Sequence, residues 1–272
     1  FKSDSKIKPL GTFTFTKVST KTCKGKAYYT ITFKAEWSNE THPSPVFPNN
    51  AMFSPLIGAT HNMYYEMWRR GRMASGGVQL VAETGNATIL DNEIMREKRY
   101  GNVLSQFRAT AATMTPGMTD FTKILVNETH SLISLISMIF PSPDWFVGIS
   151  NMDMCNKITG EWREDYTRDL LPYDSGTDDG TSFESPDSVT NPRKSIFLIG
   201  KDDETSFKSS SNIRRLGVLT IKRIEETDDD EDNGGNDNND DDDNVVNAAS
   251  TSTGRSIVVA ITTFLIMSIL HA

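Results

Sequence analysis

Three aspartates stand in turn-rich segments from which their carboxylates could converge on one cation. Asp144 follows a proline and precedes an aromatic residue within 141–148, and Asp174 and Asp178 flank a Ser-Gly-Thr loop. Carboxylates on loops at strand ends suit calcium, because this ion takes several oxygen ligands in irregular geometry. The alternative is that each aspartate closes its own turn by bonding local backbone. Spacing alone leaves both interpretations open.

The charge of the chain is concentrated in one segment. The 272 residues carry a formal net charge of −8, but residues 225–243 hold twelve acidic residues and no basic one. Residues 1–224 hold 27 of the 28 basic residues and 24 of the 36 acidic residues, a balance of about +3. This part is nearly neutral and, with 37% hydrophobic residues in the chain, can form a core. Nothing in this balance indicates nucleic-acid binding.

The two cysteines and three potential N-glycosylation sites favour a secreted protein. Cys23 and Cys155 are the two cysteines, and the four histidines show no metal-ligand spacing that would complete a zinc site. One long-range disulfide is the natural pairing in a secreted chain. Asn-x-Ser/Thr triplets for glycosylation begin at Asn39, Asn86 and Asn127, although such triplets also occur by chance.

An acidic segment and an apolar segment follow the core. Residues 226–250 are predicted to form an acidic, disordered linker, because they have almost nothing apolar to bury. Residues 251–272 contain an apolar run at 257–270, which as a helix spans roughly 21 Å against a hydrocarbon core of ~30 Å. This composition predicts a glycosylphosphatidylinositol anchor signal, with Asn247 as the attachment residue and Ser250 as its rival. A short transmembrane helix is the alternative.

Hydrophobic periodicity predicts a mostly β domain. Strict alternation over 12–16 and 29–37 indicates strands, and further strands are expected over 195–199 and 217–221. Residues 131–140 fit a helix as well as a buried strand, and the β-rich neighbours favour a strand. One face of the second strand carries a set of apolar residues: Tyr29, Ile31, Phe33, Ala35 and Trp37.

Helical patterns appear between residues 60 and 107. Residues 64–70 and 91–98 are predicted as short helices, with Asp91 as the N-cap of the second and the pair Gly76-Gly77 ending the first. The summary prediction is a β-sandwich with short helical insertions. Trp145 and Trp162 are expected to be buried.

A basic cluster surrounds the predicted first helix. Trp68 with Arg69, Arg70 and Arg72 forms either a binding patch or a helix with one buried aromatic and a solvated basic face. We favour the second interpretation.

No catalytic constellation is convincing. His130 and Ser131 are adjacent, but a nucleophile-elbow signature and a Gly-rich oxyanion loop are both missing from the sequence. We therefore expect no enzyme. A secreted metal-dependent hydrolase using the three aspartates is kept as an alternative, as is a calcium-dependent membrane-binding module.

The chain resembles the spondin-domain family, of the F-spondin and mindin type. Three groups of motifs carry the resemblance, in the same order along the chain: 37–38 with 53–61 and 65–69, then 130–132 with 141–148, then 169–178 with 183–186. The resemblance covers about residues 8–225, which we take as one spondin domain. It implies a C2-like antiparallel β-sandwich that lies outside the cell.

The resemblance also implies a site and a set of partners. Asp144, Asp174 and Asp178 match the family's structural calcium ligands, and Cys23 and Cys155 match a family disulfide. Family members act in matrix attachment and cell adhesion, and one type acts in innate immunity. The expected partner is therefore a cell-surface or matrix protein or glycan, with an integrin-like receptor among the candidates, and the expected location is the outer face of the cell membrane. No cysteine follows Cys155 in this sequence, so we expect none of the family's usual thrombospondin repeats within it.

Overall fold

The fold is described from a computed structural model. Within it, the described residues are 14, 19–44, 46–208, 213–225 and 245–248. The strand predicted over 12–16 lies outside them, apart from Thr14. Most of the predicted linker and the whole of the predicted anchor signal also lie outside the described residues.

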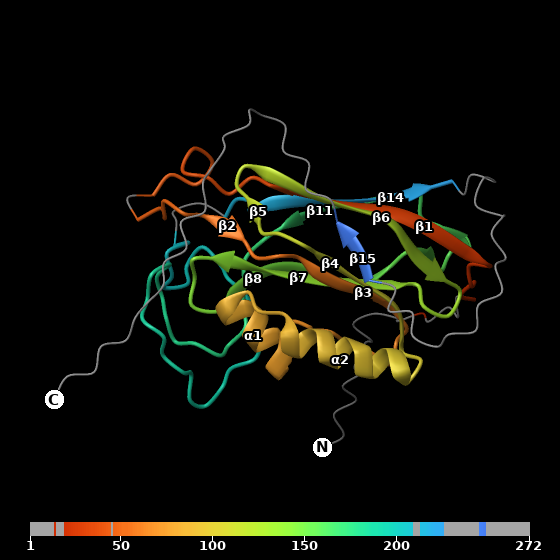
Figure 1. The fold of residues 1–272 in the computed structure, drawn as a ribbon, viewed down its shortest axis with the longest axis horizontal. Coiled ribbons are helices and arrows are strands. Elements are labelled where there is room, and N and C mark those ends of the chain that lie inside the picture. Colours follow the sequence, from red (N-terminus) through yellow and green to blue (C-terminus); the bar gives the residue numbers. More distant parts are fainter. Residues whose placement is uncertain (1–13, 15–18, 45, 209–212, 226–244, 249–272) are drawn as a thin grey trace, which may run out of the picture.

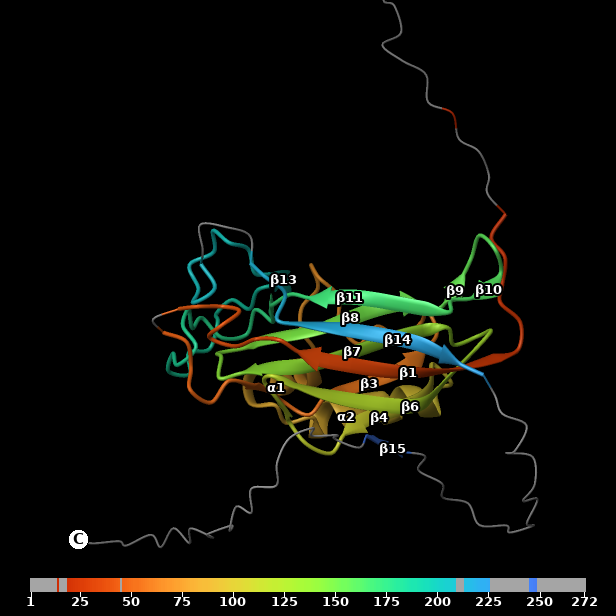
Figure 2. The ribbon, with the colours of Figure 1, turned by 90° about the horizontal axis from the view of Figure 1, so that it is seen from above.

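Two mainly antiparallel sheets lie face to face, as Figures 1 and 2 show. The smaller has the strand order β11 (Asp165–Leu170), β14 (Gly217–Ile224), β1 (Lys26–Ala35), β6 (Gly117–Asn127). The larger has the order β13 (Phe197–Leu198), β12 (Tyr173–Asp174), β8 (Trp145–Asp153), β7 (Leu132–Phe140), β3 (Ile57–His61), β4 (Val103–Ala109), β15 (Val245–Ala248). The predicted mostly β, antiparallel sandwich is confirmed.

Short elements complete the two sheets. In the larger sheet, β2 (Met52–Phe53) pairs with β7 and with β5 (Thr113–Met114). A separate hairpin joins β9 (Cys155–Asn156) to β10 (Glu161–Trp162). β15 runs parallel to β4, with Asn247 opposite Arg108.

The main core fills the space between the sheets. The five apolar residues that alternate along β1 and beyond it, from Tyr29 to Trp37, are each at most 1% exposed. This confirms the face predicted from period two, because alternate side chains of a strand point to the same side. Phe33, Phe53 and Trp37 meet at ring-centroid distances of 5.0 to 6.1 Å. Trp145 and Trp162 are also buried.

A second core lies on the outer face of the larger sheet, where α1 (Gly76–Thr84) and α2 (Thr88–Arg99) cover it (Figure 1). Val81 and Leu90 of the helices and Ile57 and Ile136 of the sheet belong to this core. β7 is therefore buried on both faces. A strand covered on both sides needs a continuous apolar run, which explains why residues 131–140 also fitted a helix.

The helix predicted over 64–70 is wrong, because these residues form turns and irregular structure instead. The helix of this region is α1, whose N-cap Ser75 accepts a hydrogen bond from the Val78 N–H at 3.1 Å. The pair Gly76-Gly77 thus begins a helix and does not end one. A Cβ at Gly77 would lie 2.6 Å from Leu90 Cα, so the glycine lets the two helices approach closely.

The second predicted helix is confirmed, but it begins three residues earlier than predicted. α2 begins at Thr88 after the N-cap Ala87, so Asp91 lies inside its first turn and is not the N-cap. The Asp91 carboxylate instead accepts hydrogen bonds from Gln106 and Arg108 of β4. None of the helices among the described residues combines the length and the hydropathy needed to cross a membrane.

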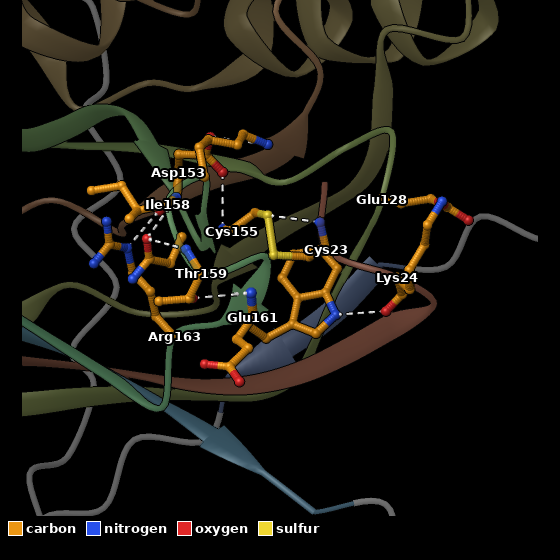
Figure 3. Close-up of a disulfide and its surroundings, with 12 residues drawn as sticks. Cys23, Lys24, Glu128, Asp153, Cys155, Ile158, Thr159, Glu161 and Arg163 are labelled. Carbon is orange, nitrogen blue, oxygen red and sulfur yellow. Dashed lines mark hydrogen bonds and ion pairs between the residues drawn. A yellow bond between two sulfur atoms is a disulfide. The ribbon is translucent and has the colours of Figure 1, made fainter. Parts of the chain in front are cut away.

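The predicted disulfide is confirmed between Cys23 and Cys155 (Figure 3). It fastens the segment before β1 to the β9–β10 hairpin, and Trp162 supports this contact by donating a hydrogen bond from Nε1 to the Lys24 carbonyl at 3.0 Å. The two cysteines are 132 positions apart, and both are buried.

Replacing both cysteines by alanine should lower the free energy of unfolding by about 2–5 kcal/mol, because the unfolded chain regains the entropy of a long loop. Urea denaturation followed by fluorescence measures this change. Wild-type protein treated with reductant should match the double variant. Equal denaturation midpoints for oxidised wild type and variant would contradict the prediction.

Candidate functional site

The three predicted aspartates lie together at one end of the larger sheet. Asp144 immediately precedes β8, and Asp174 ends β12, whose pairing with β8 sets Asp174 opposite Trp145. Asp178 lies four residues further along the same loop. Their residues are 0%, 7% and 5% exposed, respectively, so all three carboxylates are removed from bulk water.

Asp144 organises the loop that follows β12. Its Oδ2 accepts hydrogen bonds from the Thr177 N–H at 2.8 Å, the Asp178 N–H at 3.1 Å and the Ser175 hydroxyl at 3.0 Å. Its Oδ1 is buried and has no hydrogen-bond partner among the described residues. A buried carboxylate oxygen without a donor is costly, so this atom is the natural position for a ligand.

Asp174 uses both of its oxygens. Oδ1 accepts from the Gly176 N–H at 2.8 Å, and Oδ2 accepts from Trp145 Nε1 at 3.2 Å. Gly176 has a φ of +75°, and a Cβ there would lie 2.3 Å from the Lys194 carbonyl oxygen. The turn therefore requires glycine at this position.

Asp178 closes a neighbouring turn. Its Oδ1 accepts from the Gly180 N–H at 2.6 Å, and its Oδ2 accepts from the Ser188 N–H at 2.7 Å. The turn-closing interpretation of the sequence thus describes Asp174 and Asp178 correctly. It does not exclude a ligand role, because a carboxylate oxygen has more than one lone pair.

The buried carboxylates of Asp144 and Asp174 repel each other. Burial first, and then the charge of Asp144, raise the pKa of Asp174 to about 7. Burial also raises the pKa of Asp144, against the lowering effect of its hydrogen bonds from Thr177, Asp178 and Ser175. The site therefore favours a proton or a cation.

A hollow of about 190 Å³ adjoins the site. Carboxylates and one amine line much of it: Asp174, Asp178, Asp179, Lys194, Asp203 and Glu204. Lys194 Nζ lies 2.8 Å from Asp179 Oδ1. Over the described ranges, no set of three His, Cys, Asp or Glu side chains is arranged to hold a metal ion. The loops at this end of the larger sheet bring the three predicted aspartates together without forming a complete ligand set. Calcium binding therefore stays a prediction.

Sequence reasoning missed a buried pair, His61 and Ser134. Nε2 of His61 lies 2.8 Å from Ser134 Oγ, which also accepts a hydrogen bond from the Asn151 N–H at 2.9 Å. His61 and Ser134 are both 0% exposed. The pair joins β3, β7 and β8 inside the larger sheet. The other histidine considered, His130, lies at the surface and bonds the Gly101 carbonyl through Nε2.

The three acceptor asparagines lie at turns. Asn39 and Asn86 are exposed, and Asn127 is half-buried. Asn86 Oδ1 accepts from the N–H and the hydroxyl of Thr88, and Asn127 is bonded in the same way by Thr129. Glycosylation at these positions stays a prediction.

The comparisons with known proteins define the class of this chain. The Spondin_N family model matches residues 27–214, so the chain belongs to the spondin family, as its motifs predict. It is 39% identical to Spondin-2 of Rattus norvegicus over 178 residues, covering 64% of this chain and 53% of the relative.

Further relatives give the same picture. The identity to Spondin-2 of Homo sapiens is 38% over 196 residues, covering 71% of this chain and 58% of the relative. The identity to Spondin-1 of Bos taurus is 36% over 178 residues, covering 63% of this chain and 22% of the relative. The matched part thus spans just over half the length of the Spondin-2 relatives.

The pKa of Asp174 predicts how stability depends on pH when divalent cations are chelated. The ordinary pKa is 3.8 and the folded value is about 7. The folded state thus binds the proton more tightly than the unfolded state. The free energy of unfolding therefore falls as pH rises from about 4 to about 7. The largest fall is about 1.4 kcal/mol for each unit of difference between the two pKa values.

Thermal unfolding between about pH 5 and pH 8 in chelator measures this slope. His61 and His42 act in the opposite direction, since burial lowers their pKa values. The relevant quantity is therefore the difference between wild type and Asp144→Asn. We expect a shallower fall in the variant, because it loses both the raised pKa of Asp144 itself and the charge beside Asp174. Equal slopes would contradict both effects.

Proposed function

We propose that this chain is an extracellular, calcium-binding adhesion or recognition domain of the spondin type. Its ligand is a cell-surface or matrix protein or glycan, and integrin-like receptors are among the candidates. The observation that carries the calcium part is Asp144 Oδ1, a buried oxygen with no hydrogen-bond partner among the described residues, beside a second buried carboxylate.

Electrostatics support calcium at this end of the sandwich. Two adjacent buried carboxylates destabilise the fold when both are ionised, and a divalent cation between them would reverse that effect. Asp144 Oδ1 and the carboxylates of Asp174 and Asp178 would hold the ion. Its role is structural: it would fix the loops after β12, which together with the preceding turn form a ligand surface.

Calcium should raise the thermal unfolding temperature of the wild type, and Asp144→Asn should abolish that rise. The substitution is nearly isosteric, and the amide oxygen can still accept from Thr177 and Asp178. It replaces Oδ1 of Asp144, which lacks a partner within the described ranges, by an NH2 group, which cannot bind a cation. Scanning calorimetry with calcium and with chelator measures the effect.

Asp202→Asn is the matched control. Its side chain is 82% exposed and pairs only with Lys201 among the described residues, so the calcium response should stay at the wild-type level. An unchanged calcium response in Asp144→Asn, or no response in the wild type, would sink the calcium part of the proposal.

Extracellular location is supported by the disulfide between Cys23 and Cys155 and by the three acceptor triplets. Disulfides of this kind persist in oxidising compartments and are rare in the cytosol. Membrane attachment is proposed from composition alone, through the small residues around Asn247 and the apolar run at 257–270.

Treating intact expressing cells with phosphatidylinositol-specific phospholipase C should release the protein into the medium. The lipid anchor is the only link that this enzyme cuts. Asn247→Gln is expected to reduce surface display, with Asn244→Gln as the neighbouring control. Protein that stays on the cells after digestion would contradict the lipid anchor.

A further inference from the structure

The segment from Arg69 to Arg72 is a tight turn with a basic tip. The Arg72 N–H donates to the Arg69 carbonyl at 3.0 Å, which closes the turn. Gly71 has a φ of +83°, the left-handed region that glycine adopts at this turn position. Arg70 stands at the tip and is exposed, as is Arg72. Because this segment is a turn and not the predicted helix, its arginines project from one short, ordered stretch.

A second basic segment lies directly beside this turn. The Gly71 N–H donates to the Ile196 carbonyl at 2.7 Å, and the Ile196 N–H donates to the Arg72 carbonyl at 2.8 Å. A β-bridge between Met73 and Ser195 continues the pairing. The two segments together form what we call the basic ridge: Arg69, Arg70, Arg72, Arg193 and Lys194, all of them exposed.

The basic ridge is only partly neutralised by the protein. Arg69 pairs with Glu66 at 2.9 Å, and Lys194 pairs with Asp179 at 2.8 Å. In the described part of the chain, no carboxylate pairs with the other three members of the ridge. Arg193 donates one hydrogen bond to Gln79 Oε1 at 2.9 Å, which leaves its charge without a counter-ion among the described residues. The charges of Arg70, Arg72 and Arg193 therefore stay available for a partner.

The chemistry of the ridge selects an oxyanion partner. A guanidinium group offers planar, paired donors that match carboxylate and phosphate oxyanions, and a sulfate presents similar oxygens. Anionic lipids are concentrated in the cytoplasmic leaflet, away from an extracellular domain. We propose that the basic ridge binds a sulfated polysaccharide of the glycosaminoglycan class. This inference rests on the proposed extracellular location and deepens the proposed function by naming a ligand class.

The test measures retention of the full chain on immobilised heparin in a NaCl gradient. The wild type should be retained at physiological ionic strength. The double variant Arg70→Glu with Arg72→Glu should elute at lower salt and lose about tenfold or more in affinity, because two charge-assisted contacts become repulsive.

The matched control is the double variant Lys24→Glu with Lys157→Glu. It makes the same change in net charge near the disulfide. The β9–β10 hairpin, which carries Cys155, lies at the opposite end of the sandwich from β13, the strand that follows Lys194 of the ridge (Figure 2). Its elution should stay close to that of the wild type. An equal loss in both double variants would overturn the proposal, because binding would then follow net charge alone.

Two further measurements complete the test. Binding of the wild type to phosphatidylserine-containing vesicles without retention on heparin would overturn the proposal in favour of a membrane surface. The ridge variant should keep the thermal unfolding and the calcium response of the wild type. A wild type that lacks a calcium response but binds heparin through the ridge would contradict the metal site alone, so the two failures are distinguishable.

Discussion

The burial of Asp144 beside Asp174 is the constraint on which the loop end of this protein depends. One oxygen of Asp144 gathers the backbone N–H groups of Thr177 and Asp178, and this fixes the course of the loop after β12. The same burial raises the pKa of both carboxylates, because water no longer screens them. The loop is thus held by a group that favours the presence of a cation or a proton.

Aromatic packing in the main core holds Asp174 in place. Trp145 donates to Asp174 and contacts Phe183 and Phe207, at ring-centroid distances of 5.6 and 5.3 Å. These rings belong to the main core between the sheets. A movement of the loop after β12 would therefore disturb the core. This packing makes the site rigid, as a structural metal centre requires.

One segment connects the acidic site to the basic ridge. The Lys194 N–H donates to the Gly176 carbonyl at 2.9 Å, and two residues later Ile196 pairs with the turn that carries Arg70. The candidate metal site and the proposed polyanion surface are therefore parts of one framework. A cation at the first would also reduce the negative charge near the second.

The sequence by itself determined the class of fold, the inward face of β1 and the family, because period-two alternation and ordered motifs are local properties of the chain. It also placed Asp144, Asp174 and Asp178 in turns, but it left their purpose open between turn closure and ligand binding. Only the tertiary structure decided that Asp144 has one bonded oxygen and one without a partner in the described part of the chain, because its donors lie more than thirty positions away. The tertiary structure likewise decided against a helix at 64–70, since the buried Trp68 donates from Nε1 to the Leu135 carbonyl, 67 positions away, and such long-range contacts outweigh local propensity.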